Sequence, residues 1–497
     1  MRTCTRSTRF AALALMGVTL VGCGGKSSSN TGGGGTVTPP STNAQWTWVA
    51  GSNAVLSTGS YGTLGTAAAS NQPAARYGAA YWTDTSGNFY MFGGLQNGSA
   101  TLSFMNDLWR YSPSSNQWTW LSGSNSANPG GNYGTINVAA GSNVPGGRFF
   151  PAFWRDSSGN LYLFGGLGVD KNGVLSSGPV YMNDLWKYNI SANQWTWIGG
   201  SNTGANGTVA PTPAVYGTKG TAAATNLPGL RYESVSVTDS SGNFWLFGGV
   251  GADSNGTVGS LSDLWKYSTT TNQWTWVAGP NVGNQAATYG TLGTAAAANT
   301  PSGRYNASGW ADSSGNIWVF GGSQGATTSG TNGPTSTFTP INDLWKFTTS
   351  NNQWTWVSGS STAGAAGVYG TKGTAASANT PGARAFSTTW VDSSGNFYLF
   401  GGGGGTGSSG SLFNDLWKYS PTSNQWTWVA GSSSAATTGT YGTLGTSAAS
   451  NVPGGRLGSS AWIDGSGNLW LFGGLGYDAT GTTNNPNTLN DLWKYQP

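Results

Sequence analysis

Six copies of one unit fill most of this sequence, and this repetition restricts the fold more than any other feature. Each copy carries a Gly-Gly pair at the end of an apolar run and, after a loop, the motif Asp-Leu-Trp. The glycine pairs begin roughly 72 to 83 residues apart, at Gly93, Gly165, Gly248, Gly321, Gly401 and Gly473. A unit of this kind buries its apolar face against its neighbours. The repetition therefore predicts one continuous domain.

Each unit contains four short runs that are rich in aromatic and β-branched residues, which is typical of strands. The first two runs are joined by turns such as Asp156 to Asn160, "DSSGN", in which the glycine suits the left-handed position of a tight hairpin. The last two are joined by turns of the type "SPTSN". Four antiparallel strands per unit, repeated six times, predict an all-β fold and favour a β-propeller.

The two ends of the repeat region each hold part of a unit. The run Gln45 to Val49, "QWTWV", has no Asp-Leu-Trp motif before it, and the last motif, Asp491 to Trp493, has no "QWTW" after it. The first run is therefore expected to be the outer strand of the last unit. Such pairing closes a ring of sheets and leaves the first and last units without unpaired neighbours.

The spacing of aromatic residues resembles the kelch repeat, in which a Gly-Gly pair is followed by a tyrosine and a tryptophan with six residues between them. The pairs here are Tyr111 and Trp118, Tyr188 and Trp195, Tyr267 and Trp274, Phe347 and Trp354, and Tyr419 and Trp426. The resemblance implies a monomeric six-bladed kelch-type propeller over residues 45–497, with the propeller fold of galactose oxidase. It does not select a function, because kelch propellers include both binding proteins and enzymes.

Residues 1–23 have the features of an export signal, with three arginines followed by a short apolar stretch. The sequence Leu20-Val21-Gly22-Cys23 resembles the bacterial lipobox, which implies lipidation of Cys23. Residues 24–44 are rich in Ser, Gly, Thr and Pro and are expected to form a flexible linker. These features predict a lipid-anchored protein of the cell envelope, on the outer rather than the inner membrane, that faces the periplasm or the exterior.

The charge pattern offers no surface for nucleic acid. The whole chain has a net charge of +4, and three of its cations lie in the leader, so the remainder is nearly neutral. Charged residues are 7% of the chain, against roughly 25% in ordinary soluble domains. No basic tract remains, so we expect no nucleic-acid partner and no membrane contact beyond the lipid anchor.

Histidine is absent from the chain, and Cys23 is the one cysteine outside the removed leader peptide. This argues against the copper chemistry of galactose oxidase, which needs histidine ligands, and we expect neither a cofactor nor a metal site. Twelve of the 16 acids recur at fixed places in the units, which indicates structural roles. The turn aspartates leave calcium as an alternative, although one carboxylate per turn is few for a site.

Glu233 is the one glutamate in the chain. It stands two residues after Arg231, one of six arginines that open the units. The corresponding residues elsewhere are Gly78, Phe150, Asn306, Phe386 and Gly458. This varied set is expected near the mouth of a central channel, and we predict ligand contacts from Arg231, Glu233, Phe150, Asn306 and Phe386. Glu233 either meets a ligand or forms an ion pair with Arg231.

The connections that leave the second and fourth strands of each unit emerge on one face, here called the long-loop face. Those after the fourth strand repeat closely, whereas those after the second differ, as in Leu167 to Met182 and Ser323 to Ile341. Variable loops on a rigid frame are typical of binding sites. We therefore expect a non-catalytic recognition module that binds a glycan or a protein. The alternatives are a sugar mutarotase or epimerase that uses Glu233, Arg231 or Arg155, and a structural envelope protein.

Overall fold

The computed structural model describes residues 44–96, 102–173, 178–206, 211–325, 327–330, 333–336, 338–404, 411–480 and 486–497. Within these ranges the chain forms strands and turns and no helix, so the prediction of an all-β fold is confirmed. The leader with Cys23 and the linker up to residue 43 lie outside the described residues. None of the described residues forms a helix that could cross a bilayer.

Six sheets contain the same core of four antiparallel strands. The first three sets are β2 (Ala80–Thr83), β3 (Phe89–Phe92), β6 (Leu108–Ser112) and β7 (Gln117–Ser122); β9 (Ala152–Arg155), β10 (Leu161–Gly168), β11 (Val180–Asn189) and β12 (Gln194–Gly199); and β14 (Val235–Thr238), β15 (Phe244–Ala252), β16 (Val258–Ser268) and β17 (Gln273–Ala278). The other three are β19 (Ser308–Ala311), β20 (Ile317–Phe320), β23 (Leu344–Thr348) and β24 (Gln353–Ser358); β26 (Thr388–Val391), β27 (Phe397–Phe400), β30 (Leu416–Ser420) and β31 (Gln425–Ala430); and β34 (Ser460–Ile463), β35 (Leu469–Gly476), β36 (Asn487–Gln496) and β1 (Gln45–Ala50).

The second strand of each set is buried on both of its faces, whereas the first alternates between buried and partly exposed residues in five of the six sets. In β15, for example, the run from Phe244 to Phe247 is buried throughout. A strand that is covered on both faces reads as a continuous apolar run in the sequence. The turn before it begins at Asp239 and places Gly242 at a φ of 80°, a backbone conformation that favours glycine.

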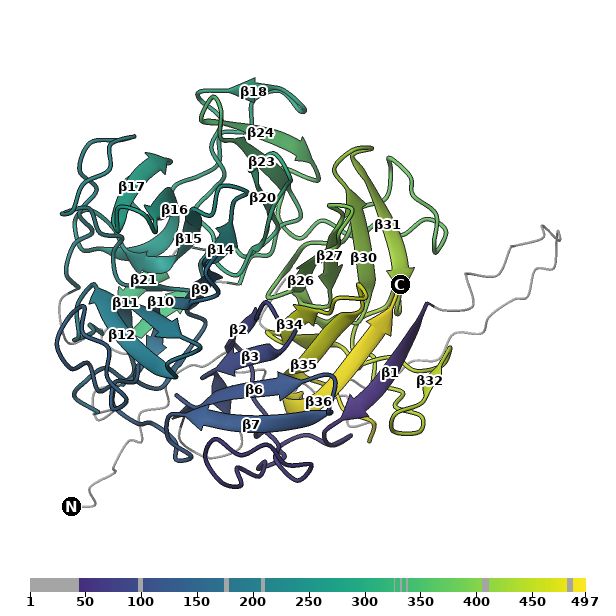
Figure 1. The fold of residues 1–497 in the computed structure, drawn as a ribbon. Coiled ribbons are helices and arrows are strands. Elements are labelled where there is room, and N and C mark those ends of the chain that lie inside the picture. Colours follow the sequence, from purple (N-terminus) through teal and green to yellow (C-terminus); the bar gives the residue numbers. More distant parts are fainter. Residues whose placement is uncertain are drawn as a thin grey trace, which may run out of the picture.

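The pairing of β1 with β36 joins the two ends of the described chain. Trp46 lies opposite Tyr495 and Trp48 opposite Trp493 in an antiparallel register. Figure 1 shows β1, in purple, beside β36, in yellow. This is the pairing that the split repeat predicts. The free edge of β1 is covered in turn by β32 (Ser447–Ala448), and β24 is covered in the same way by β18 (Ala295–Ala296).

The first strands of the six sheets contact one another in cyclic order. The contacts run from β2 to β9, β14, β19, β26 and β34, and from β34 back to β2. Figure 1 shows the sheets arranged around a common centre in this order. The architecture is thus all-β, with several antiparallel sheets placed side by side in a manner compatible with a propeller.

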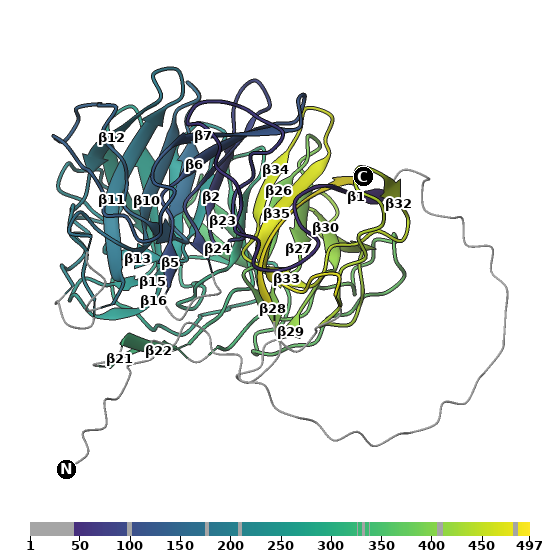
Figure 2. The same cartoon turned by 90° about the horizontal axis from the view of Figure 1, so that it is seen from below.

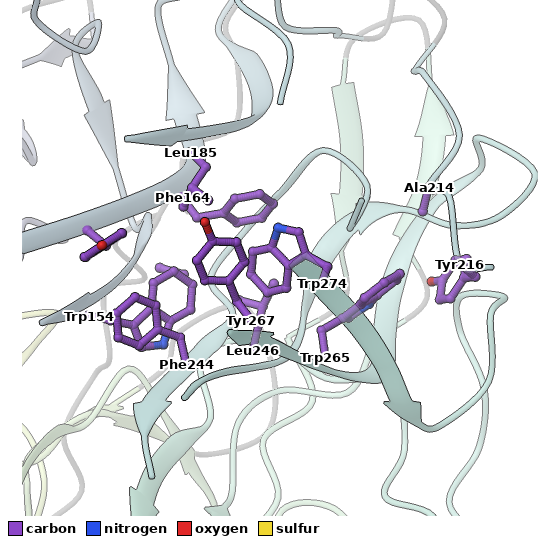
Figure 3. Packing of buried hydrophobic residues seen from close by; sticks show 12 residues of the cluster. Trp154, Phe164, Leu185, Ala214, Tyr216, Phe244, Leu246, Trp265, Tyr267 and Trp274 are labelled. Atoms are coloured by element: carbon purple, nitrogen blue, oxygen red, sulfur yellow. The ribbon is translucent and has the colours of Figure 1, made fainter. Parts of the chain in front are cut away.

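Aromatic side chains fill the space between neighbouring sheets. Trp154 of one sheet stacks on Phe244 of the next, with ring centroids 5.3 Å apart and planes 6° from parallel. Figure 3 shows Trp154 and Phe164 facing Phe244, Tyr267 and Trp274 across this boundary. The indole N–H of Trp154 also donates to the carbonyl oxygen of Trp245 at 3.1 Å. Stacked aromatic pairs of this kind each add about 0.5–1.5 kcal/mol beyond the burial of their area.

The long-loop face carries most of the remaining strands. Figure 2 shows β21, β22, β28 and β29 together at one end of the molecule. These short strands are β4 (Leu95–Gln96), β5 (Ser103–Phe104), β8 (Arg148–Phe149), β13 (Arg231–Tyr232), β21 (Thr327–Gly330), β22 (Gly333–Ser336), β25 (Arg384–Ala385), β28 (Gly403–Gly404), β29 (Ser411–Leu412) and β33 (Arg456–Leu457). The tight turns that join first to second strands lie at the opposite end, here called the short-turn face.

Candidate functional site

A buried cluster surrounds the aspartate of every Asp-Leu-Trp motif. In the third unit the guanidinium of Arg231 donates to both carboxylate oxygens of Asp263 at 2.8 Å, and the Tyr216 hydroxyl and the Trp265 indole each donate to Oδ2 at 2.7 Å. The equivalent residues are Arg76, Asp107, Tyr61 and Trp109; Arg148, Asp184, Tyr133 and Trp186; Arg304, Asp343, Tyr289 and Trp345; Arg384, Asp415, Tyr369 and Trp417; and Arg456, Asp491, Tyr441 and Trp493. Because the same cluster recurs in all six units, its role is to stabilise the fold.

Arg231 is buried and forms its ion pair within its own cluster. Its side chain is 1% exposed, and its ion pair is with Asp263, whose side chain is 0% exposed. Burial opposes the guanidinium charge, but the Asp263 carboxylate outweighs it and raises the pKa of Arg231. Burial, followed by the charge of Asp263, raises the pKa of Tyr216. In the described chain no ion pair joins Arg231 to Glu233, so the ion-pair interpretation of Glu233 is wrong.

The aspartates of the short turns use their oxygens within the turn. Asp239 Oδ1 accepts the backbone N–H groups of Ser241 and Asn243 at 2.9 Å, and its Oδ2 accepts the Asn243 amide at 3.0 Å and the Trp245 indole at 2.8 Å. A short polar side chain that bonds to its own turn in this way fixes the hairpin. Within the described residues no group of three or more His, Cys, Asp and Glu side chains comes together as a metal site would require.

Three further aspartates link neighbouring loops of the long-loop face by accepting hydrogen bonds from their backbone N–H groups. Asp253 follows β15, and its Oδ1 accepts the backbone N–H groups of Asn255 and Thr257, whereas its Oδ2 accepts that of Gly283 at 3.1 Å from the connection after β17. Asp170 and Asp478 make the same kind of link, to the backbone N–H groups of Gly204 and Val55 respectively. The 15 aspartates of the chain thus all accept hydrogen bonds that hold the fold together, and Glu233 is the one acid outside these three groups.

Glu233 belongs to a closed ring of backbone hydrogen bonds at the centre of the molecule. The N–H of each ring residue donates to the carbonyl oxygen of the ring residue before it, at 2.7 to 3.0 Å. The ring runs through Gly78, Phe150, Glu233, Asn306, Phe386 and Gly458 and returns to Gly78. All six have a positive φ, between 46° and 68°. Residues other than Gly, Asn and Asp rarely adopt this conformation, which costs them about 1–2 kcal/mol, so closing the ring overrides local preference at Phe150, Glu233 and Phe386.

The side chain of Glu233 is largely buried. The residue is 8% exposed, and burial raises its pKa to about 8, an effect that the nearby Asn306 amide partly offsets. Glu233 is close enough to Tyr77, Tyr181 and Tyr232 to raise the pKa of each of them further, after burial as the first cause. At neutral pH Glu233 is therefore mostly protonated, so it can donate as well as accept a hydrogen bond.

Two phenylalanines of the ring close the channel at its long-loop end. The Phe150 and Phe386 ring centroids are 5.5 Å apart. Phe150 also fills the space beside two ring glycines, because its ring atoms lie 3.1 Å from where a Cβ of Gly78 or of Gly458 would stand. Phe386 in turn contacts Phe338 from a variable loop, at 6.4 Å between centroids. The ring is thus filled by aromatic side chains.

A cavity of about 120 Å³ lies beside this ring inside the channel. Glu233, Asn306, Phe150 and Phe386 all line it, so the structure brings together four of the five residues that the sequence predicts as ligand contacts; Arg231 lies in its own cluster. The remaining polar lining includes Ser236, Ser308 and Thr389, and the remaining aromatic lining Tyr81 and Phe153. Asn306 Nδ2 is buried without a hydrogen-bond partner in the described structure.

The channel residues three positions beyond the ring were not predicted from the sequence. They are Tyr81, Phe153, Ser236, Gly309 and Thr389, all of which line the cavity. The sequence did contain a signal for them, because they differ from unit to unit while the residue after them is a tryptophan in five of the six units. The tyrosine of each "YGT" motif was likewise not predicted as a partner of the buried aspartate, since the two are separated by about 50 residues.

No family model matches the chain, and no curated protein matches it.

Proposed function

We propose that the chain is a six-bladed kelch-type β-propeller. The cyclic contacts of the six first strands support this, as does the closed ring of backbone hydrogen bonds at their ends. The kelch spacing is also consistent with the pairing of strands. Tyr267 lies opposite Trp274 on the adjacent strand, for example, and their ring centroids are 5.0 Å apart. In a propeller the long loops of all blades meet around one end of the channel.

The propeller would act as a recognition module that binds a glycan or a protein through the long-loop face. The observation that carries this proposal is an aromatic patch at the centre of that face, formed by Tyr77, Phe149, Tyr181, Tyr232 and Phe338. Successive members lie close together: Tyr77 and Phe149 are 5.9 Å apart, Phe149 and Tyr232 6.0 Å, and Tyr181 and Tyr232 5.4 Å. Tyr77, Phe149 and Tyr232 stand directly after the leading arginine of three successive units, whereas Tyr181 and Phe338 come from the variable connections Leu167 to Met182 and Ser323 to Ile341.

The chemistry of the patch favours a glycan over a protein. Its tyrosines combine a flat apolar ring with a hydroxyl group, which suits a ligand that has both apolar ring faces and polar edges. Tyr77, Phe149, Tyr232 and Phe338 are each partly exposed. In the fifth and sixth units Ala385 and Leu457 replace the aromatic residue after the leading arginine, so the patch is asymmetric around the channel. Asymmetry of this kind allows one ligand orientation to be preferred.

A glycan-array screen of the full chain in a mild detergent tests this function, with calcium and with a chelator. Specific binding is expected in both buffers, and Tyr232→Ala is expected to weaken it at least tenfold. Trp197→Ala is the matched control, because Trp197 is a half-buried aromatic residue on the outer strand β12 and lies outside the patch. Binding that both variants keep would contradict the proposed surface. A clean negative array would overturn the glycan assignment and direct the search to envelope proteins.

The anchor is part of the same proposal. We propose that Cys23 is lipidated and that the propeller is held at the outer membrane of a cell envelope by the linker of residues 24–44. Growth with radiolabelled palmitate followed by membrane fractionation tests it. The wild-type chain is expected to carry label and to fractionate with outer membranes, whereas Cys23→Ser is expected to be unlabelled and soluble. Equal membrane association of both chains would contradict the anchor.

A further inference from the structure

The central channel is blocked at one end and open at the other. At the long-loop end, Phe150 and Phe386 fill the ring of backbone hydrogen bonds. Towards the short-turn face, the cavity shares Tyr81, Phe153 and Ser236 with a second hollow of about 330 Å³. That hollow is also lined by Thr83, Arg155 and Thr238, the last residues of β2, β9 and β14. Access to Glu233 therefore comes from the short-turn face.

The deep end of the channel presents an unusual set of polar groups for a protein interior. Asn306 Nδ2 is a buried donor that forms no hydrogen bond of ordinary geometry within the described chain, although it lies close enough to the Glu233 carboxyl group to lower the pKa of that group. A buried polar group without a good hydrogen bond is unfavourable. Glu233 beside it is an acid that lies outside the structural clusters of the frame. A ligand oxygen that accepts from Asn306 would remove this cost.

The cavity walls complement these polar groups with aromatic surface. The Tyr81 and Phe153 rings are 4.6 Å apart, and the Tyr81 and Thr389 side chains interact across the cavity. Each molecule of liquid water takes about 30 Å³, so the 120 Å³ of the cavity corresponds to the room of about four waters. Together with the adjoining hollow of about 330 Å³, that space suits one pyranose-sized ring with its hydroxyl groups.

We propose that the channel is a binding site for one uncharged, hydroxyl-rich ring of pyranose size, which enters from the short-turn face and meets Asn306 and Glu233 at its deep end. Aromatic walls would cover the apolar faces of the ring, and the amide and carboxyl groups would bond to its hydroxyls. A cation is disfavoured, because the unsatisfied group is a donor. A carboxylate ligand is disfavoured, because none of the residues that line the cavity carries a positive charge to offset that of the ligand.

Tyr77, Tyr181 and Tyr232 of the aromatic patch lie close to Glu233, but the ligands of the two sites enter from opposite faces, so either proposal can fail without the other. The test is titration calorimetry of the full chain with methyl hexopyranosides, and with glucosamine and glucuronate as charged counterparts. At least one neutral pyranoside is expected to bind more tightly than either charged sugar. No binding of any neutral probe at millimolar concentration, or a preference for a charged probe, would overturn the proposal.

Two variants locate the site. Asn306 has a φ of 49°, so Asn306→Gly keeps a residue that tolerates this backbone and removes the amide; it is expected to weaken binding at least tenfold. Asn272→Gly is the matched control, because Asn272 has a φ of 54° in the turn between β16 and β17, away from the channel. It is expected to bind as the wild type does. Equal loss in both variants, or loss in neither, would contradict the assignment.

The pH profile provides an independent readout. The groups that face Glu233 are the Asn306 amide and the hydroxyls of Tyr77, Tyr181 and Tyr232, whose raised pKa values keep them neutral. Wild-type affinity is expected to fall above about pH 8, where Glu233 loses its proton. Glu233→Gln is expected to bind within about threefold of wild type at pH 6.5 and to show no such fall. A fall of the same size in both chains would exclude Glu233 from the site.

Discussion

Gly78 donates its backbone N–H to the carbonyl oxygen of Gly458 at 2.8 Å. These glycines precede the first strands of the first and the last sheet, so this one bond closes the ring that the other five build. Both residues also contact the Phe150 side chain. Ring closure and the blocked end of the channel therefore depend on the same small group of residues.

Gly458→Ala is expected to lower the free energy of unfolding by more than a conformational effect alone. Alanine at a φ of 64° costs about 1–2 kcal/mol, and the new Cβ would stand 3.1 Å from Phe150. Gly467→Ala is the matched control, since its φ is 81° and no atom lies within 4 Å of the place that its new methyl group would take. Urea unfolding gives both values. Equal losses would show that the contact with Phe150 contributes nothing.

Trp46→Ala is expected to destabilise the protein by about 3–5 kcal/mol. Trp46 is 2% exposed, and its ring lies 5.5 Å from that of Phe400 in the neighbouring sheet and 5.0 Å from that of Tyr495. Trp48→Ala changes the same strand at a half-buried position and is expected to cost clearly less. Denaturant unfolding checks the difference, and equal costs would contradict the role of β1 as a packed member of the last sheet.

Asp263→Ala is expected to cost about 3–5 kcal/mol, because it leaves the Arg231 guanidinium buried without its counter-ion. Tyr216→Phe removes one hydrogen bond to the same carboxylate and is expected to cost about 1.5–3 kcal/mol. Both values come from urea unfolding of the full chain. The aspartate variant is expected to be the less stable of the two. A tyrosine variant as damaging as the aspartate variant would mean that the ion pair is not the centre of the cluster.

Glu233→Gln is expected to change how stability depends on pH. The pKa of Glu233 is about 8 in the folded protein, against an ordinary value of 4.5, so between these values the folded state holds a proton that the unfolded state has lost. The contribution of Glu233 to the free energy of unfolding is therefore largest below about pH 4.5. It falls as the pH rises to about 8, by up to about 1.4 kcal/mol per pH unit. The variant lacks this slope. Parallel stability profiles of the two chains at pH 5.5, 7 and 8.5 would contradict the buried carboxyl.

Asp239→Ala is expected to cost about 1–3 kcal/mol, because the Trp245 indole and the turn N–H groups lose their acceptor. Calcium and a chelator are expected to give the same melting temperature for the wild type, since protein donors already occupy both oxygens of this aspartate. Differential scanning calorimetry measures both effects. A calcium-dependent rise in melting temperature that Asp239→Ala reduces would establish a metal site at the turns.

The sequence predicted the parts of the fold that recur. An all-β chain, the tight hairpins and the pairing of the run from Gln45 with the strand after Asp491 all follow from six aligned copies. The repeated aspartates were rightly interpreted as structural, because the structure places each of them in the same contacts in every unit. Arg231 was predicted as a ligand contact and instead belongs to one of these repeated clusters. Which arginine pairs with which aspartate was not predictable from the sequence. Arg231 and Asp263, for example, are 32 residues apart and come into contact only in the folded chain.

The candidate site was predictable only in part, and for a physical reason. Phe150, Glu233, Asn306 and Phe386 stood out because they vary at one fixed position. Nothing in the sequence indicated that this position has a left-handed backbone, since phenylalanine and glutamate disfavour it. Nor did it indicate which end of the channel is closed, because that depends on where the Phe150 side chain points. Both facts belong to the assembled ring and not to any single unit.

The pairing of β1 with β36 also bears on how the protein is made. Among the described strands β1 is synthesised first and β36 last, so the sixth sheet cannot form until all the strands between them have been made. Until then Trp46 and Trp48 have no strand to pair with, and a chain that stops early would expose this edge for good. Contacts between distant parts of a sequence slow folding and leave intermediates prone to aggregation. Formation of the sixth sheet would thus have to wait until the strands of the other five sheets have been synthesised.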